Sequence, residues 1–363
     1  MLLCLNWAME RSGSLISAST LGTILLMISF FQTWKFIAEA KNVPVPAVFF
    51  FGDSYGDTGN NDYISTSIKG NFPPYGRDFI HHIPTGRLSN GKLIPDYIVE
   101  GLGVKDLLPP YLDPKLQDSD LITGVSFDSA GTGLDNITST IQEVIPFWKE
   151  VEYFKEYKTR LIGLVGDERA NMILSEAIYF IVIGTNDFAV NYYNYPFRSA
   201  HYTVSQYTDF LLQIYASHIK ELYSLNARKI GLINLPPLGC LPIKRSKGEC
   251  VEEINQAASG FNEGMNAMIE HLKPVLPGLK IVSLDYHAVI LDFIQNPGKF
   301  GFQVTANGCC FATDTETGFC KKFTPFTCAD ADKYVFFDSV HLSQKAYQVI
   351  ANVFLRREIL RLL

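Results

Sequence analysis

The sequence predicts an α/β protein in which helices cover both faces of a mainly parallel β-sheet. Short apolar runs alternate along the chain with longer helical segments, and these runs are apolar throughout rather than at every second residue. Strands that are buried on both faces have this composition, and the helices between them supply the crossovers that parallel strands need. There is no internal repeat, low-complexity linker or sharp change in composition, so we expect a single domain.

The predicted elements begin with the apolar run 47–51. Further predicted strands are the runs 177–183, 229–235 and 280–285, with a strand-like run at 334–337. Helical sequence occupies 93–102, 141–163, 168–175, 210–222, 254–272 and 343–355. Ser343 is a candidate cap for the last helix. The polar, proline-rich stretch 60–91 is long for a loop inside a compact domain, and such loops are usually functional or lid-like.

The first forty residues have the features of a secretory signal peptide. Arg11 precedes the apolar stretch 21–31, and the Ala-Glu-Ala sequence at 38–40 offers a cleavage site. The apolar stretch is about half as long as a membrane span requires, which favours a signal peptide over an anchor. Met9 is an alternative start. The sequence therefore predicts a signal peptide at 1–40, one secreted domain at 41–363, and no stable membrane span in the mature chain.

Cysteine usage agrees with export. Six cysteines follow the predicted cleavage site, all in loop-like sequence: Cys240, Cys250, Cys309, Cys310, Cys320 and Cys328. Because the chain has no Cys-x-x-Cys pair or histidine cluster, disulfides are favoured over a metal site. Cys240 and Cys250 could close a short loop, whereas the adjacent Cys309 and Cys310 cannot easily pair with each other, and the connectivity stays open. Asn136 opens an Asn-Ile-Thr sequon and is a candidate glycosylation site.

Ser54 is the candidate nucleophile. It lies just past the run 47–51, where open α/β sheets hold their reactive groups, although a plain glycine-flanked turn is the alternative. A serine nucleophile needs a base, and the base needs an orienting partner. Asp338 precedes His341 by three residues in a turn, a spacing that can bring the carboxylate onto the imidazole Nδ1. A capping aspartate beside a surface histidine is the alternative for this pair.

An oxyanion hole could form from three groups. The candidates are the Ser54 N–H, the Gly131 N–H, which no side chain shields, and the side-chain amide of Asn186, which follows the run 177–183. Taken alone, Gly131 is better explained by a tight turn, and Asn186 by a turn or a helix cap. Together, these segments could converge at one edge of the sheet.

At this level of detail the sequence resembles the large plant form of the GDSL esterase/lipases, in the SGNH hydrolase superfamily. The resemblance covers about 48–350 and rests on a combination of motifs: FGDSYGDTGNN, PTGRLSNGKLIPDYI, GVSFDSAGTG, IGTNDF, ARKIGLINLPPLGCLP, DSVHLS and the Cys309-Cys310 pair. It implies a three-layer α/β/α sandwich of flavodoxin-like type. It also implies a catalytic triad of Ser54, Asp338 and His341, an oxyanion hole that includes Gly131 and Asn186, and no metal or organic cofactor.

Three positions depart from the family pattern: Asp128, Phe337 where a tryptophan is common, and Leu342 where a proline is usual. The change at Asp128 bears on activity. The glycine motif usually reads Phe-Ala-Ser, and here Asp128 stands in place of the alanine. A carboxylate near the oxyanion donors would disfavour a developing negative charge if it pointed inward, and would be only a turn aspartate if it pointed outward. The geometry of this side chain therefore bears on activity.

The expected function is a secreted serine esterase or lipase that hydrolyses carboxylic esters through an acyl-enzyme. The substrate would be a small-molecule, lipid or polymer ester, and the location the apoplast or cell wall. An acyltransferase on the same site, or a catalytically weak binding or structural wall protein, are the alternatives. The net charge of −6 shows no basic excess, so nucleic acid is not expected as a partner.

Overall fold

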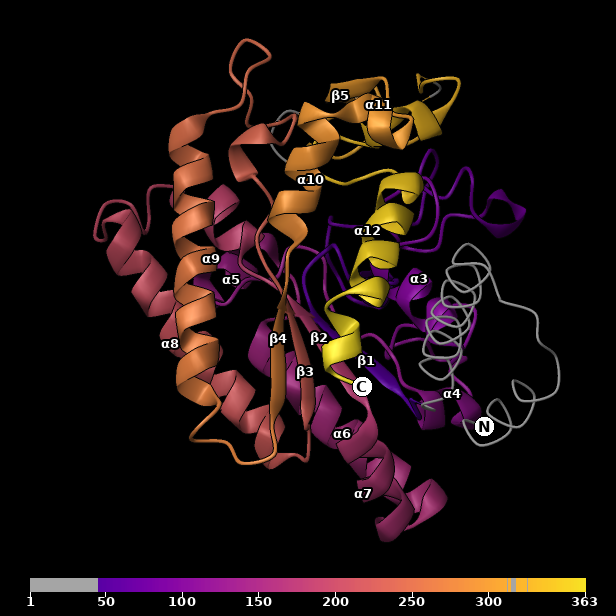
Figure 1. Cartoon of the computed structure of the whole chain (residues 1–363). Coiled ribbons are helices and arrows are strands. Elements are labelled where there is room, and N and C mark those ends of the chain that lie inside the picture. The colour runs from indigo at the N-terminus through magenta and orange to yellow at the C-terminus, as the bar shows by residue number, and fades with distance from the viewer. Residues whose placement is uncertain (1–44, 312, 315–317, 325) are drawn as a thin grey trace, which may run out of the picture. The chain divides into compact units, whose positions relative to one another are not determined.

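The computed structural model describes residues 45–311, 313–314, 318–324 and 326–363 (Figure 1). The predicted signal peptide at 1–40 lies outside these residues, so it stays a prediction. Among the helices of the described ranges, none combines the length and the apolar character that crossing a membrane would take.

Four parallel strands form the central sheet in the order β1-β2-β3-β4: β1 Val48–Gly52, β2 Ile178–Val182, β3 Lys229–Ile233 and β4 Lys280–Leu284. The segment 125–129 continues the sheet beyond β1, because Phe127 N donates to Phe50 O at 2.8 Å and Ser129 N donates to Gly52 O at 2.9 Å. After β1, the chain first adds the segment 125–129 along one edge of this strand and then adds β2 along its opposite edge. The space past the carboxyl ends of β1 and β2 is therefore the topological switch point, where open α/β sheets bind their ligands.

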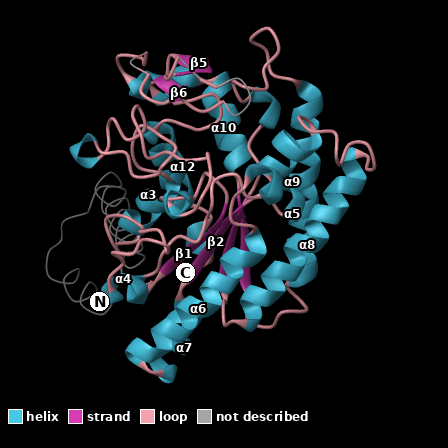
Figure 2. Cartoon of the chain, turned by 180° about the vertical axis from the view of Figure 1, so that it is seen from behind, coloured by secondary structure: helices cyan, strands magenta, loops and turns pink. Residues whose placement is uncertain are grey.

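Helices cover both faces of this sheet, which gives the predicted α/β/α layers (Figures 1 and 2). The long helices α6 and α8 lie on one face, with α9 packed along α8, and α3 and α12 pack together on the other face. Their bounds are α3 Ile94–Gly101, α6 Phe147–Val165, α8 Val204–Ser224, α9 Glu252–Leu272 and α12 Gln344–Arg356. As expected, Ser343 caps α12, its Oγ accepting from Ala346 N.

Shorter elements connect these layers. They include α4 Asp118–Thr123, α5 Asn136–Gln142, α7 Asp167–Glu176, α10 Tyr286–Gln295, α11 Pro297–Phe300 and a parallel pair of strands, β5 Val304–Gly308 and β6 Tyr334–Phe336. A π-helical turn spans Asp187–Tyr192, and 3₁₀ turns span Asn60–Tyr63, Ile80–His82, Leu238–Cys240, Ala331–Lys333 and Ile359–Arg361.

Aromatic packing fixes the strand that precedes Ser54. The Phe51 ring stacks on Phe127 with centroids 4.9 Å apart, and Phe154 of α6 meets both rings edge-on. Each of these side chains is at most 1 % exposed. Aromatic pairs add about 0.5–1.5 kcal/mol each beyond the area they bury. The end of β1 and the segment 125–129 are therefore held together as one unit.

The predicted element order missed the short elements α4, α11 and β5, and it was wrong at two further helices. The helix expected at 141–163 is two helices, because Glu143 adopts a left-handed conformation (φ 54°) at the end of α5 and Pro146 then precedes α6. A proline disfavours the α conformation of the residue that precedes it, so the helix is interrupted at this point. The helix α10 was not expected. It begins after Asp285, whose carboxylate accepts from Ala288 N at 3.0 Å and caps it.

The six cysteines form three disulfides, which confirms the prediction and fills in the open connectivity. Cys240 pairs with Cys250 in the loop before α9. Cys309 pairs with Cys328, and Cys310 with Cys320, so the adjacent cysteines reach different partners in the segment 309–328.

Candidate active site

The turn after β1 places Ser54 at the switch point. Gly52 has φ 125°, and a Cβ at this position would lie 1.9 Å from Val182 O of the neighbouring strand. Only glycine fits such a close approach at positive φ. Asp53 N then donates to Val182 O at 2.8 Å, which fixes the turn against the end of β2. Ser54 is 6 % exposed and lines a cavity at this edge of the sheet.

Asp338 and His341 form a buried pair, and His341 lines the same cavity. His341 Nδ1 lies 2.8 Å from Asp338 Oδ2, and both side chains are fully buried. A carboxylate only accepts hydrogen bonds, so the imidazole carries its proton on Nδ1 and its Nε2 is the basic nitrogen. His341 Nε2 has no hydrogen-bond partner in the described part of the chain. A capping aspartate beside a surface histidine does not describe this arrangement, since His341 is buried.

Three further donors hold the Asp338 carboxylate. Its Oδ1 accepts from the backbone N–H of Val340 at 2.8 Å and of His341 at 2.6 Å. The Tyr75 hydroxyl donates to its Oδ2 at 2.7 Å and accepts from Cys320 N at 3.0 Å. The position of the aspartate is therefore over-determined by its own turn, by the proline-rich stretch and by the disulfide-bonded segment.

Sequence reasoning missed Tyr75. It lies in the stretch 60–91, in which 72–76 reads Phe-Pro-Pro-Tyr-Gly, and it is 1 % exposed. A single tyrosine among turn formers gives no local signal for a contact with a residue 263 positions later. The only indication was the unusual length of this stretch.

The three candidate oxyanion donors lie around the same cavity, which Ser54, Gly131 and Asn186 all line. Within the described ranges, the N–H groups of Ser54 and Gly131 donate to no protein acceptor. Asn186 Nδ2 donates to Thr132 O at 3.0 Å, which orients the amide and leaves its second N–H available. Gly131 has φ 96°, a conformation that favours glycine, and a Cβ there would also make a tight contact, 3.1 Å from Ile68 Cδ1.

Asp128 points neither into the cavity nor into solvent. It is fully buried and does not line the cavity. Its Oδ2 accepts from Ser126 Oγ at 2.9 Å, and its Oδ1 packs so closely on Gly56 that a Cβ there would lie 2.0 Å away. Burial, with added repulsion from Asp57 and Asp53, raises the pKa of Asp128 well above its ordinary value. The side chain therefore directs no carboxylate at the oxyanion donors.

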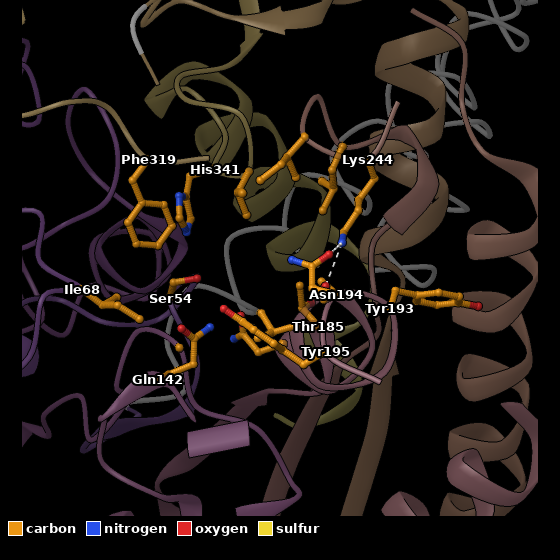
Figure 3. A pocket seen from close by; sticks show the side chains of 17 residues that line it. Ser54, Ile68, Gln142, Thr185, Tyr193, Asn194, Tyr195, Lys244, Phe319 and His341 are labelled. Atoms are coloured by element: carbon orange, nitrogen blue, oxygen red, sulfur yellow. Dashed lines mark hydrogen bonds between the residues drawn. The ribbon is translucent and has the colours of Figure 1, made fainter. Parts of the chain in front are cut away.

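The cavity has a volume of about 540 Å³ and a mixed polar and apolar lining (Figure 3). Figure 3 shows Ser54, His341, Phe319 and Ile68 on one side and Lys244 toward the other. In the described ranges, no group of three or more His, Cys, Asp or Glu side chains is arranged to hold a metal ion. Outside the cavity, Asn136 is exposed, as a glycan acceptor requires.

The parallel sheet, with its cavity past the carboxyl ends of the strands, places this chain in the class of α/β proteins that hold their reactive groups at this edge. Residues 48–354 match the family model for GDSL-like lipase/acylhydrolases. The chain belongs to this family, and it is a hydrolase acting on ester bonds.

The chain is similar to individual relatives and, more distantly, to solved structures. In Arabidopsis thaliana, GDSL esterase/lipase At2g04570 is 45% identical over 92% of this chain and 95% of its own, and GDSL esterase/lipase At4g26790 is 46% identical over 87% and 92%. Among solved structures, a catalytic mutant of the acetylxylan esterase Axe2 from Geobacillus stearothermophilus is 15% identical, with a TM-score of 0.39 over 86% of this chain and 93% of that one.

Proposed function

We propose that this protein is a secreted serine esterase that hydrolyses carboxylic esters through an acyl-enzyme on Ser54. One observation carries the proposal. Ser54 shares its cavity with a buried histidine whose Nδ1 is bonded to Asp338 and whose Nε2 is unpartnered among the described residues. A histidine with its tautomer fixed in this way is ready to accept a proton from a serine hydroxyl.

The first half-reaction forms the acyl-enzyme. Ser54 Oγ attacks the ester carbonyl carbon while His341 Nε2 takes the hydroxyl proton. The carbonyl oxygen becomes an oxyanion, which the N–H groups of Ser54 and Gly131 and the side-chain amide of Asn186 stabilise. His341 then gives its proton to the leaving alcohol as the tetrahedral intermediate collapses.

The second half-reaction releases the acid. Water enters after the alcohol leaves, His341 takes a proton from it, and the resulting hydroxide attacks the acyl carbon. The same donors hold the second oxyanion, and His341 returns the proton to Ser54 Oγ. Asp338 stays ionised throughout and stabilises the imidazolium that forms in each half.

The proposed secretion rests on the signal-like segment 1–40, on three disulfides and on an exposed sequon at Asn136. Disulfides persist in oxidising compartments and are rare in the cytosol. Expression of the full chain with a C-terminal tag tests this proposal. The tagged protein is expected in the medium with a shortened amino terminus, and retention of the uncleaved chain inside the cell would contradict it.

Stopped-flow hydrolysis of p-nitrophenyl acetate and longer acyl esters tests the acyl-enzyme. The wild type is expected to release a burst of nitrophenol equal to the enzyme concentration if deacylation is slower. Ser54→Ala should lose the burst and the turnover, and Ser217→Ala, at an exposed serine on α8, should keep both. Equal, negligible rates in the wild type and Ser54→Ala would contradict the proposal. Formation of a transesterified product with added alcohols would instead identify acyl transfer.

A further inference from the structure

The side of the cavity away from Ser54 contains an ammonium group. Lys244 lines the cavity, and its Nζ donates to Ala189 O at 2.7 Å and to Asn194 Oδ1 (Figure 3). Both partners are uncharged oxygens in and just after the π-helical turn Asp187–Tyr192. An ammonium has three N–H donors, so one is left for another acceptor.

No negative charge among the described residues of the cavity wall balances this cation. In the part of the chain that the structure describes, the cavity lining includes no aspartate or glutamate and Lys244 forms no ion pair. Burial alone lowers the pKa of Lys244 to about 8. A partly desolvated cation without a counter-ion is costly, and an anion bound beside it would recover part of that cost.

The backbone holds Lys244 in a fixed relation to the reactive groups. Lys244 N donates to Leu241 O at 2.8 Å, and the preceding Ile243 N donates to Ser339 O at 3.0 Å, in the turn between Asp338 and His341. The Cys240–Cys250 disulfide closes the same loop. A substrate group bound at Lys244 would therefore lie at a set distance from Ser54.

We propose that Lys244 is a specificity residue that binds a carboxylate on the ester substrate, separate from the ester bond, so that half-esters of dicarboxylic acids or esters of hydroxy acids are favoured substrates. A carboxylate matches the single charge and the single remaining donor. A phosphate dianion would leave one negative charge unbalanced, because Lys244 is the only lysine or arginine among the described residues that line the cavity. This inference rests on the proposed esterase function.

Matched ester pairs measure the preference. In an acyl series, p-nitrophenyl monoesters of succinic, glutaric and adipic acids are compared with uncharged p-nitrophenyl esters of the same chain length. In an alcohol series, acetates of hydroxy acids are compared with acetates of simple alcohols by pH-stat. In at least one series, kcat/KM for the charged ester should exceed that of its uncharged partner roughly tenfold, as a charge-assisted hydrogen bond allows.

Variants assign the preference to the ammonium. Lys244→Met keeps the apolar stem and should abolish the charged-to-uncharged ratio, Lys244→Arg should keep most of it, and Lys220→Met on the exposed side of α8 should leave it unchanged. If Lys244→Met does not fold, wild-type inhibition decides the question. Glutarate should then compete with an uncharged ester, whereas glutaramide at the same concentration should not.

The outcomes separate this inference from the function on which it rests. Hydrolysis of neither ester class by the wild type would contradict the esterase proposal. Hydrolysis of both classes at equal kcat/KM in both series, without inhibition by glutarate, would overturn the role of Lys244 alone. A phosphate-bearing ester that is preferred over its carboxylate analogue would overturn the choice of ligand. A ratio that is unchanged in Lys244→Met would overturn the assignment to this residue.

Discussion

Removing the Tyr75 hydroxyl tests how Asp338 is held. Tyr75→Phe deletes a 2.7 Å hydrogen bond to the carboxylate and leaves Cys320 N–H without its 3.0 Å acceptor. The ring contacts to Phe72 and Phe337, with centroids 5.5 and 5.8 Å away, are preserved in the variant. The change therefore isolates the polar role of the side chain.

The two losses have different consequences. A hydrogen bond to a charged group contributes about 1.5–3 kcal/mol, and a buried unsatisfied N–H costs about 1–3 kcal/mol. Since the terms share one hydroxyl and do not add fully, we expect a loss of about 2–4 kcal/mol in the free energy of unfolding. Asp338 keeps its bonds to Val340 and His341. We therefore expect kcat/KM to fall only about tenfold, against about 10⁴-fold for Asp338→Asn.

Two assays on the same preparations measure these effects. Thermal unfolding at a fixed scan rate gives the stability change, and steady-state hydrolysis of p-nitrophenyl acetate gives kcat and KM. Tyr63→Phe, at an exposed tyrosine of the same stretch, is the matched control; it should leave kcat and KM unchanged and lower the melting temperature far less than Tyr75→Phe. A Tyr75→Phe protein with wild-type melting temperature and wild-type kcat would refute the reasoning about this hydrogen bond. A loss as large as that of Asp338→Asn would refute the claim that the other donors suffice.

Three further substitutions test the oxyanion site and the buried aspartate. Gly131→Ala should lower both stability and kcat, because its φ of 96° and the 3.1 Å approach to Ile68 strain an added Cβ; a fully active, stable variant would contradict this. Asn186→Ala should lower kcat about 10²–10³-fold with little change in KM, and an unchanged kcat would remove it from the oxyanion hole. Asp128→Asn should keep its activity. Burial raises the pKa of Asp128, so the folded wild type retains a proton that the unfolded chain loses above about pH 4. Above about pH 4, the free energy of unfolding of the wild type should therefore fall relative to that of Asp128→Asn, by up to about 1.4 kcal/mol per pH unit. A difference in melting temperature that does not change with pH would contradict this.

The sheet and its strands were predictable because their signal is local. Each central strand is a short run of apolar residues, and burial on both faces leaves no other pattern for the sequence to show. The helix boundary at Pro146 was also readable in principle, since proline restricts the residue before it. The helix α10 was missed although Asp285 offered a capping signal, because its apolar residues follow β4 directly and no glycine or proline separates the two elements.

The residues of the site also fall into those that a local motif predicts and those that only the folded chain brings together. Ser54, Gly131, Asn186, Asp338 and His341 each lie in a short motif, and family resemblance supplied what spacing alone left open. Contacts such as Tyr75 with Asp338, or Lys244 with Ala189, join segments far apart in the chain. No local pattern encodes such contacts, since they depend on how loops from different strands meet above the sheet.

Covalent labelling of Ser54 tests the central claim most directly. The mature protein would be treated with a fluorophosphonate, which forms a stable adduct with an activated serine, and the modified peptide identified by mass spectrometry. We expect one adduct, on Ser54, that appears in step with the loss of esterase activity and is absent from the Ser54→Ala and His341→Ala variants. An adduct on another residue, or complete loss of activity with Ser54 unmodified, would contradict the account.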